Sequence, residues 1–428
     1  MSCAVPITIC FLNFFLLINL NFIRVYFLQI YIFLVYTIHI YMKICSKCVM
    51  PETAESLKFD DKGSCSVCTQ IKFKQTNIDW KSRGKEFDFI LNRFRNKNDY
   101  DCIVPFSGGK DSTFTLWYIV TQKKLKPLVV RFDHGFYRKN HEENVKKTIS
   151  KLGVDFINFK ANQKIVNMMM IESLVRRGDF CWHCHVGVTA YPIKIAIEKK
   201  IPLLILGEPS AEYGSFYNYN DIEYLNVEKF NKMSNLGINA EDMLGMIKDR
   251  FKNEKIDKRD IDPFRFPSQE ELNKHNILGI YLGSYVPWDV KKQVKIIKEE
   301  LNWKGDEVEG IPPEYDYEKI ECYMQGVRDY LKYIKRGFGR TSHLTSIDIR
   351  NGRLERDDAL KMVNAYDGKR PKALDFFLKI TNISEDEFYD YAFNHIVDPH
   401  EELDRNFLKK NMSNKVPKDF DEIEKSLK

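Results

Sequence analysis

Short apolar runs alternate with longer amphipathic stretches through the middle of the chain. The apolar runs predict β-strands because they are too short to form buried helices. They span 101–106, 127–132, 154–159 and 201–206. Amphipathic stretches at 113–120 and 141–152 separate the first three runs and predict helices. Strands that alternate with helices are typical of a parallel sheet covered on both faces, so we predict an α/β fold with a doubly wound, mostly parallel sheet.

A glycine-containing turn joins the first predicted strand to the first predicted helix. Its residues are Ser107, Gly108, Gly109, Lys110, Asp111 and Ser112. The glycines let the backbone fold closely around an anion, and the N–H groups at a helix start favour phosphate. The serine hydroxyls and Lys110 add donors and positive charge. A Walker loop would need glycine at Val104 and serine or threonine at Asp111, so the turn predicts a phosphate site of another type.

Polar residues also follow two other predicted strands. Asp133 comes directly after the second strand, and Gly207 and Glu208 follow the strand at 201–206. Ligands of doubly wound sheets bind outside the carboxyl ends of the strands. We therefore expect Asp133 near the ribose or adenine edge of a nucleotide and the Gly207 backbone close to the nucleotide. Glu208 is a candidate substrate contact, and ordinary turn residues are the alternative for both acids.

Two C-x-x-C pairs near the beginning of the polar sequence indicate a metal site. Residues 49–64 separate the two pairs, which is within the spacing of four-thiolate sites. The candidate ligands are Cys45, Cys48, Cys65 and Cys68. Four thiolates complete the tetrahedral coordination of Zn²⁺, so the pairs predict a structural zinc ribbon over 42–75. Nothing else in the sequence indicates the oxidising compartment that disulfides would require.

A third C-x-x-C pair lies in the sequence C-W-H-C-H. Its polar residues are Cys181, His183, Cys184 and His185. They are too closely spaced to bind one tetrahedral metal ion together. Four interpretations stay open: half of a metal or iron–sulfur site completed by Cys102 or Cys322, a redox pair, an acid–base cluster in a pocket, or buried thiols beside an aromatic residue. His183, Cys184 and His185 are candidate catalytic residues.

The first 41 residues form an apolar extension in which Arg24 is the only charged side chain. They either reflect a start upstream of Met42 or form a membrane segment, because about 20 apolar residues suffice to span a bilayer. A signal peptide fits poorly, since no basic residue precedes the apolar run. We expect the enzyme to begin near Met42 and to be cytoplasmic, with membrane association only through residues 1–41.

The rest of the chain divides into three further parts. Residues 213–275 are polar with weak periodicity and predict an insertion within a nucleotide-binding domain over 98–300. Residues 301–408 predict a mainly helical C-terminal region that binds substrate or another anion. Residues 409–428 are polar and lysine-rich and predict a loosely ordered tail.

Arginines gather in the C-terminal region between Arg336 and Arg353, where glycines flank them. Arginine pairs bidentately with carboxylates and phosphates, and glycine-flanked loops would let several guanidinium groups converge on one ligand. The cluster predicts an anion subsite with Arg340, Asp348 and Arg350 as candidate contacts. Solvated charges at helix ends are the alternative.

Composition and charge add two limits. With 44 % hydrophobic and 29 % charged residues, the chain is an ordinary globular protein and not a disordered or collagen-like one. A formal net charge of +6 over 428 residues is too small to indicate nucleic-acid binding, which normally requires a clustered basic excess. We therefore expect no nucleic-acid partner.

The loop from Ser107 to Ser112 resembles, residue for residue, the S-G-G-x-D-S loop of the PP-loop ATP pyrophosphatases. This resemblance implies a sheet of the PP-loop type and cleavage of ATP between its α- and β-phosphates, with adenylation of a substrate oxygen. It also implies that the loop, including Lys110, binds pyrophosphate and that Asp111 lies near Mg²⁺.

A larger set of motifs over about residues 43–400 resembles the N-acetyl sugar amidotransferases of lipopolysaccharide O-antigen and flagellar-glycan biosynthesis. The motifs are C-x-x-C-V-M-P-E-T, the second C-x-x-C, S-G-G-K-D-S, C-W-H-C-H, G-E-P-S-A-E-Y-G and S-I-D-I-R-N-G. The resemblance implies that ATP and ammonia convert the acetamido group of a nucleotide-linked or sialic-acid-like sugar into an acetamidino group. It implies an O-adenylyl imidate intermediate, release of AMP and pyrophosphate, and a separate glutaminase–synthase pair as the ammonia source.

Two other functions fit parts of the same sequence. A tRNA-thiolating enzyme would share the PP-loop and the zinc ribbon, and Cys181 and Cys184 would hold an iron–sulfur cluster with a third cysteine. A non-catalytic scaffold would keep the zinc ribbon and the apolar N-terminal segment and have a vestigial nucleotide site. The modest charge disfavours the first alternative, and the intact loop disfavours the second.

Overall fold

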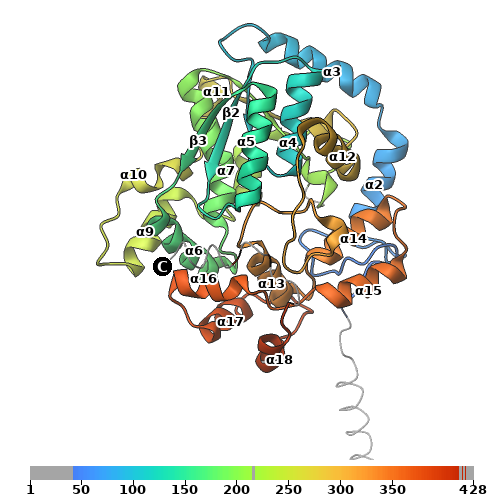
Figure 1. The fold of residues 1–428 in the computed structure, drawn as a ribbon, viewed down its shortest axis with the longest axis vertical. Helices are drawn as coiled ribbons and strands as arrows, with labels where there is room; N and C mark the ends of the chain where they lie inside the picture. The colour runs from blue at the N-terminus through green and yellow to red at the C-terminus, as the bar shows by residue number, and fades with distance from the viewer. Residues whose placement is uncertain (1–41, 215–216, 414–416, 418–419, 421–428) are drawn as a thin grey trace, which may run out of the picture. The chain divides into compact units, whose positions relative to one another are not determined.

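The computed structural model describes residues 42–214, 217–413, 417 and 420. Within these residues, six strands form one sheet in the order β3-β2-β1-β4-β6-β5 (Figure 1). The strands are β1 Cys102–Pro105, β2 Pro127–Asp133, β3 Asp155–Lys160, β4 Leu203–Leu206, β5 Tyr224–Leu225 and β6 Leu278–Tyr281. All neighbours pair in parallel except β5, which is antiparallel to β6 at the edge. The predicted α/β fold with a mostly parallel sheet is confirmed.

Strand order reverses between β1 and β4, the central neighbours in the sheet. The chain runs outward from β1 through β2 to β3 and then returns to β4, which pairs with β1 on its other side. A crevice opens outside the carboxyl ends of the strands at such a reversal. The turn at 106–109 leaves β1 at this position, and residues 207–208 leave β4 beside it.

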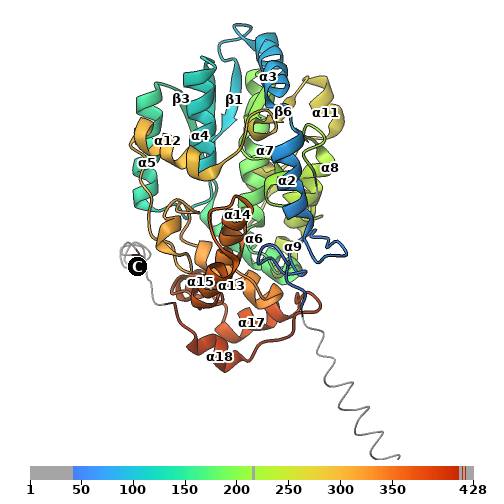
Figure 2. The same cartoon turned by 90° about the vertical axis from the view of Figure 1, so that its right-hand side faces the viewer.

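Both faces of the sheet are buried, which explains the nearly continuous apolar runs of its strands. Val104, Val129 and Ile205 pack on one side, in a core that includes residues of α4 (Lys110–Trp117) and α12 (Val290–Leu301). Ile103, Val130 and Leu204 pack on the other side with residues of α7 (Trp182–Lys199). Figure 2 shows α4 and α12 on one side of the strands and α7 on the other. The crossover helix α5 spans Lys139–Leu152.

The C-terminal region is mainly helical, as predicted. Its helices are α13 Gln325–Arg336, α14 Arg340–Arg350, α15 Arg356–Tyr366, α16 Ala373–Thr381, α17 Glu385–Phe393 and α18 Arg405–Lys410. Helices α13, α16 and α17 share an apolar core with α6 (Gln163–Arg177). The described residues from Ile44 onward form one compact unit, in which the sheet region and the C-terminal region share a core.

The four-cysteine segment contains less β-structure than a ribbon would. Isolated antiparallel bridges join Ile44 to Pro51 and Phe59 to Cys65, and helix α2 begins directly afterwards and spans Ser66–Asn77. A second helix, α3, spans Trp80–Phe94 and leads to the sheet. Cys68 therefore lies in the first turn of a helix.

The segment 213–275 forms strand β5 and several short helices. The helices are α8 Val227–Met233, α9 Ala240–Arg250, α10 Lys258–Ile261 and α11 Gln269–Lys274. Strand β5 extends the sheet by pairing with β6, and Met243, Leu244 and Ile247 of α9 join the apolar core around α6. The segment is therefore integrated with the sheet and the core.

The tail expected from residue 409 is partly structured. Arg370 N donates to Asn411 O at 2.8 Å, and Ser413 N donates to Arg370 O at 2.9 Å. The Phe420 ring is buried near Tyr323 and Phe376. The expectation of a loose tail is wrong for these residues, because an aromatic side chain in the polar sequence gains a buried position.

The apolar extension at 1–41 lies outside the described residues. A search of the described helices finds none with the length and hydrophobicity needed to cross a membrane.

Candidate functional site

The loop between β1 and α4 has the conformation that its two glycines predict. Gly108 has φ of +83°, and a Cβ atom there would lie 2.4 Å from Val145 Cγ2 of α5. Gly108 N donates to Ser112 Oγ at 3.0 Å, and Gly109 is the N-cap of α4. His141 Nε2 lies 2.8 Å from Ser107 O. Gly108 is required both by the left-handed backbone and by the close approach of α5.

Lys110 and Asp111 form the first turn of α4 and lie at the carboxyl end of the sheet. Lys110 Nζ lies 2.8 Å from Asp111 Oδ2 and 2.8 Å from Glu318 Oε2, and its side chain is only 7 % exposed. Burial opposes the charge of Glu318, but Lys110 and Arg340 outweigh burial and lower the pKa of Glu318 to about 2. The C-terminal region thus supplies a carboxylate that contacts the loop lysine.

Asp111 has a second oxygen with a different environment. Its Oδ1 atom is buried and has no hydrogen-bond partner among the described residues. A buried carboxylate oxygen without a partner is costly, and a bound cation or ligand donor would relieve that cost. Carboxylate oxygens are the ligands that Mg²⁺ prefers. Asp111 therefore fits as a ligand of the magnesium ion that would accompany ATP.

A cavity of about 300 Å³ lies directly against the loop. Ser107, Gly109, Lys110, Asp111 and Ser112 line one side of it. The opposite walls come from residues after β2 and β4 and from the beginning of α7. They include His134, Phe136, Gly207, Glu208, Cys181, Cys184 and His185. We name this space the loop cavity.

The C-W-H-C-H segment forms the beginning of α7. Burial lowers the pKa of His183 to about 3, with the nearby His185 adding to the effect. Burial and the charge of Arg328 lower the pKa of His185 to about 4, and burial raises the pKa of Cys184 to about 12. These side chains are therefore neutral at pH 7, and both imidazoles are weak bases there. Cys322 lines the same cavity as Cys181 and Cys184.

A larger cavity of about 480 Å³ adjoins the loop cavity and is rich in cations. Its basic residues are Lys110, Lys229, Lys319, Arg328, Lys332, Arg340, His343, Arg350 and Arg353. Burial and the charge of Arg340 lower the pKa of Lys332 to about 8, as expected where cations crowd together. We name this space the basic cavity. Glu55, Asp111, Glu208, Glu318 and Asp348 also line it, but lysines and arginines outnumber these acids, so its charge favours an anionic ligand.

The two arginines predicted to bind an anion, Arg340 and Arg350, lie on one helix and not in a loop, although Gly339 directly precedes Arg340. Arg340 begins α14 and Arg350 ends it, and His343, Leu344 and Ile347 line the cavity between them. This spacing places all five residues on one face of the helix. Only a short turn, Gly337–Gly339, separates α14 from α13. Convergence on one ligand arises from helix geometry.

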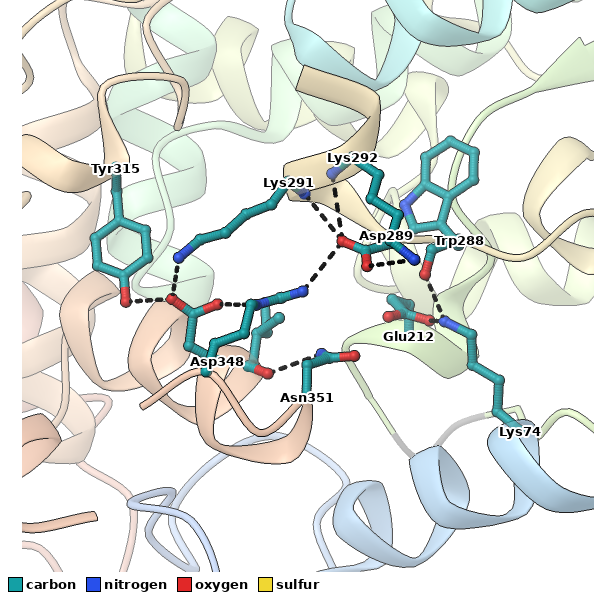
Figure 3. Close-up of polar contacts among 11 residues, drawn as sticks. Lys74, Glu212, Trp288, Asp289, Lys291, Lys292, Tyr315, Asp348 and Asn351 are labelled. Atoms are coloured by element: carbon teal, nitrogen blue, oxygen red, sulfur yellow. Dashed lines mark hydrogen bonds and ion pairs between the residues drawn. The ribbon is translucent and has the colours of Figure 1, made fainter. Parts of the chain in front are cut away.

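Asp348 also borders the basic cavity, but its carboxylate is engaged by protein groups. Lys291 Nζ lies 2.6 Å from Oδ2, Tyr315 Oη donates to Oδ2 at 2.8 Å, and Arg353 Nε donates to Oδ1 at 2.8 Å. Figure 3 shows Asp348 between Lys291 and Tyr315, with Asp289 close by at the start of α12. The contacts indicate that Asp348 joins α14 to α12 and orients Arg353.

Replacing Asp348 by Asn is expected to lower the free energy of unfolding by about 2–3 kcal/mol, because the side chain is 5 % exposed and two cations would lose their partner. Urea unfolding of the full chain measures this. The matched control is Asp358→Asn, which removes an exposed pair with Lys361 and should change stability by less than about 0.5 kcal/mol. Equal stability of the two variants would contradict the bridging role.

The two cavities meet at a shared wall. The residues that line both are Lys110, Asp111, Thr189, Glu208, Lys319 and Arg328. Burial and the charge of Asp111 raise the pKa of Glu208 to about 7. A carboxyl group that titrates near neutral pH at the meeting point of two cavities is suited to accept and return a proton.

Two residues predicted for the nucleotide site are not lining residues. Asp133 borders neither cavity, and its Oδ1 accepts from Gly135 N at 2.7 Å, as in an ordinary turn. Gly108 supports the loop from behind. Gly207 lines the loop cavity, and a Cβ atom there would lie 3.0 Å from Thr115 Oγ1.

Sequence reasoning missed several residues of the shared wall and of the basic cavity. Lys319 and Arg328 precede and begin the C-terminal helices, and Lys229 comes from α8 in the predicted insertion. Burial lowers the pKa of Lys229 to about 7. Single cations in polar sequence carry no local signal.

The four predicted metal ligands come together in a buried cluster. Their sulfur atoms all lie within 4.8 Å of one another, with Cys45 Sγ 3.9 Å from Cys68 Sγ and Cys48 Sγ 3.8 Å from Cys65 Sγ. A tetrahedral ion with metal–sulfur bonds of about 2.3 Å places its sulfurs about 3.8 Å apart. The geometry therefore fits a single tetrahedral ion. In the described part of the chain, this is the only group of three or more such ligands that close together.

Comparison with known families identifies the C-terminal region. Residues 314–422 match the family described as "LPS biosynthesis protein WbpG-like, C-terminal domain". The chain therefore carries a WbpG-like lipopolysaccharide biosynthesis domain. This region supplies Glu318, Arg328, Arg340 and Arg350, and hence much of the basic cavity.

Two further similarities concern other parts of the chain. A protein of Methanocaldococcus jannaschii named "Uncharacterized protein MJ1599" is 29 % identical over 143 residues, which cover 33 % of this chain. The match spans 50 % of that relative's own length. The structure is also similar to the U34-tRNA thiolase NcsA of Methanococcus maripaludis, solved with its 4Fe–4S cluster. That similarity covers 73 % of this chain and 86 % of the thiolase, with 14 % identity and a TM-score of 0.28.

Proposed function

We propose that the protein is an ATP-dependent amidotransferase that converts the acetamido group of a sugar into an acetamidino group and releases AMP and pyrophosphate. The observation that carries this proposal is the meeting of two cavities at Lys110, Asp111 and Glu208. One cavity borders a phosphate-binding type of loop. The other is basic, and a domain matched to lipopolysaccharide biosynthesis supplies all four of its arginines.

The loop cavity is the proposed ATP site. Backbone N–H groups in the first turn of α4 lack intrahelical acceptors and favour phosphate oxygens. Lys110 would exchange its contacts with Asp111 and Glu318 for contacts with phosphate. Mg²⁺ held by Asp111 would offset the charge of the departing pyrophosphate. The loop and Lys110 orient the triphosphate so that its α-phosphorus faces the shared wall.

The basic cavity is the proposed sugar site. An amide carbon is a poor electrophile because nitrogen donates electron density to it, and its oxygen is a poor leaving group. Attack of the acetamido oxygen on the α-phosphorus would form an O–P bond and break the bond to pyrophosphate. The amide proton then leaves, which gives an O-adenylyl imidate. Ammonia adds to the imidate carbon, AMP leaves with the oxygen, and an amidine forms.

Glu208 is the proposed proton acceptor for these steps. It borders both cavities, and its pKa of about 7 lets it take a proton from the amide or from the added ammonia and pass one to the sugar nitrogen. His183 and His185, with pKa values of about 3 and 4, are weaker bases at neutral pH. We therefore assign to Glu208 the role that the sequence suggested for the C-W-H-C-H segment.

Replacing Glu208 by Gln is expected to flatten the pH dependence of stability. The pKa of about 7 in the folded protein exceeds the ordinary value of about 4.3, so the folded state holds an extra proton between these values. The free energy of unfolding of the wild type therefore decreases as pH rises through this window. In the variant this decrease should be smaller by about 2 kcal/mol. Urea unfolding at pH 5 and pH 8 measures the difference. An identical fall in both proteins would contradict the assignment.

Ammonia is proposed to come from a separate glutaminase–synthase pair. Free ammonia is largely protonated to ammonium at neutral pH, and ammonium is a poor nucleophile. Ammonia delivered directly by the partner enzymes would therefore be the efficient donor. High ammonium concentration at raised pH should replace this partner in the assay below.

The test is mass spectrometry of the sugar product. The full chain is incubated with ATP, Mg²⁺, an ammonium salt and a panel of acetamido sugars that includes nucleotide-linked and sialic-acid-like ones. Exchange of the acetamido oxygen for NH, with AMP and pyrophosphate formed in equal amounts, is the expected result. Cleavage of ATP that no sugar on the panel stimulates would contradict the proposal.

A tRNA-thiolating enzyme is the second candidate function. The observation that favours it is that Cys181, Cys184 and Cys322 line the loop cavity together, where an iron–sulfur cluster would lie beside ATP. A brown chromophore that disappears in Cys322→Ser, together with ATP cleavage stimulated by tRNA, would support this candidate. A colourless active enzyme would remove it.

A further inference from the structure

The four-cysteine segment forms part of the wall of the basic cavity. Met50, Ala54 and Leu57 lie between the two C-x-x-C pairs, and Val67 lies within the second pair; all four residues line the cavity. The metal cluster is therefore separated from the proposed sugar site by little more than its own ligands. A metal ion that stabilised only a distant part of the fold would not lie behind the wall of the basic cavity.

Contacts between this segment and the arginine-bearing helices are direct. Val49 N donates to Ser346 Oγ of α14 at 3.4 Å, and Thr53 Oγ1 donates to the Arg336 carbonyl of α13 at 2.6 Å. Arg350 Nη1 lies 4.0 Å from Cys48 Sγ, which is within hydrogen-bond reach for a sulfur acceptor. Arg350 is thus a residue of the basic cavity that also contacts a metal ligand.

The charge of a metal-bound cluster favours the contact between Arg350 and Cys48. A divalent ion with four thiolates carries a formal charge of about −2, which the surrounding groups must compensate. Backbone N–H groups of Lys47, Cys48 and Cys65 donate to Cys45 Sγ. At Cys48 the donor is a guanidinium group. Metal occupancy would therefore hold the Arg350 side chain in place, while its remaining donors face the cavity.

We propose that the metal-bound four-cysteine cluster positions Arg350 for binding an anion in the basic cavity, so that the metal ion and the anion stabilise each other's binding. The identity of the anion as a sugar nucleotide rests on the proposed function, but the coupling does not. Reciprocity requires that an anion held by Arg350 raises the affinity for the metal by the factor by which the metal raises the affinity for the anion. We expect this gain in metal affinity to be seen as slower release of the metal.

The experiment follows zinc release from the zinc-loaded full chain to a coloured chelator, with and without UDP-N-acetylglucosamine as the probe. In the wild type, saturating probe is expected to slow zinc release about tenfold, the value of one charge-assisted contact. In Arg350→Gln, the probe should leave the release rate unchanged. Arg356→Gln is the matched control, because Arg356 Nε contacts the backbone oxygen of Cys48 at 3.2 Å without lining the cavity.

Three outcomes would overturn the proposal. They are a wild-type release rate that the probe does not change, a probe effect that persists in Arg350→Gln, and a probe effect lost equally in both variants. The measurement contains no ATP or ammonia. A failure of the coupling is thereby distinguished from a failure of the proposed reaction, whose readout is AMP, pyrophosphate and the amidine.

Discussion

Replacing Asp111 by Asn is expected to lower AMP and pyrophosphate formation by about 1,000-fold while the fold is retained. The carboxylate is the residue of the loop best suited to hold the cation that offsets pyrophosphate charge, and losing such electrostatic stabilisation costs a factor of this size. Its Oδ1 has no hydrogen-bond partner in the described part of the chain, so an amide in its place breaks no contact of that atom. Steady-state release of pyrophosphate measures the effect.

The control for this prediction is Asp88→Asn. Asp88 is half exposed on α3 and forms a surface ion pair with Lys123 at 2.6 Å. Exposed pairs contribute little to stability, so its loss should leave turnover and thermal midpoint near the wild-type values. If Asp111→Asn retained more than about a tenth of wild-type activity, the carboxylate would not be the cation ligand. Loss of folding in Asp111→Asn would instead show that its pair with Lys110 is structural.

Replacing Cys65 by Ser is expected to abolish metal binding and lower the free energy of unfolding by about 4 kcal/mol or more. Binding of a structural metal contributes directly to folding free energy, and three thiolates hold the ion far less tightly than four. Cys65 is fully buried and comes immediately before α2, where its side chain makes no capping hydrogen bond, so the loss of stability is expected to come from the metal. Metal content and thermal unfolding of the full chain measure the two effects.

Cys184→Ser provides the comparison that locates the metal. Cys184 lines the loop cavity and is not a member of the four-cysteine cluster, so this variant should keep about one zinc ion per chain. Zinc retained in Cys65→Ser, or zinc lost in Cys184→Ser, would contradict a single zinc site at the cluster. Iron lost in Cys184→Ser would favour the thiolating enzyme.

The sequence predicted β1, β2 and β4 well because each is a short, almost wholly buried apolar run, and it predicted β3 although no residue of that edge strand is fully buried. Strands β1, β2, β3 and β4 lie within or next to the predicted ranges. Strands β5 and β6 were not predicted. Gly279 lies in the middle of β6, and a Cβ atom there would be 2.6 Å from Leu225 Cβ of β5. The glycine weakens the local strand signal, and its reason is a contact with a neighbouring strand that local periodicity does not reveal.

The candidate site likewise contains residues that the sequence predicted and residues that it did not. Ser107, Lys110 and Asp111 were predictable, because the loop motif is contiguous and follows an apolar strand. The four cysteines were predictable because ligand spacing is itself a geometric constraint. The nucleotide contact of Asp133 stays a prediction. The turn geometry disfavours it, because a carboxylate after a strand can equally well accept a hydrogen bond from a backbone N–H.

The basic cavity could be anticipated only in part. Arg340 and Arg350 were predicted to bind an anion, and both line the cavity. Glu318 and Lys319 were not predicted, because their significance depends on the position of Lys110 far away in the sequence. Tertiary packing brings these charges together, and their separate local sequences resemble any solvated helix end.

The shared wall constrains how this protein can diversify. A substitution at Asp111, Glu208 or Lys319 alters both cavities at once, so a change that suits a new sugar there also disturbs the chemistry of ATP. The remaining wall of the basic cavity borders no part of the loop cavity, and it comes from α14, the four-cysteine segment, residues within 210–234 and α13 among others. Under the proposed function, selection for a different ligand of the basic cavity can therefore act on that outer wall while the shared wall stays unchanged. Exchange of that outer wall between relatives would transfer sugar preference without rebuilding the catalytic machinery.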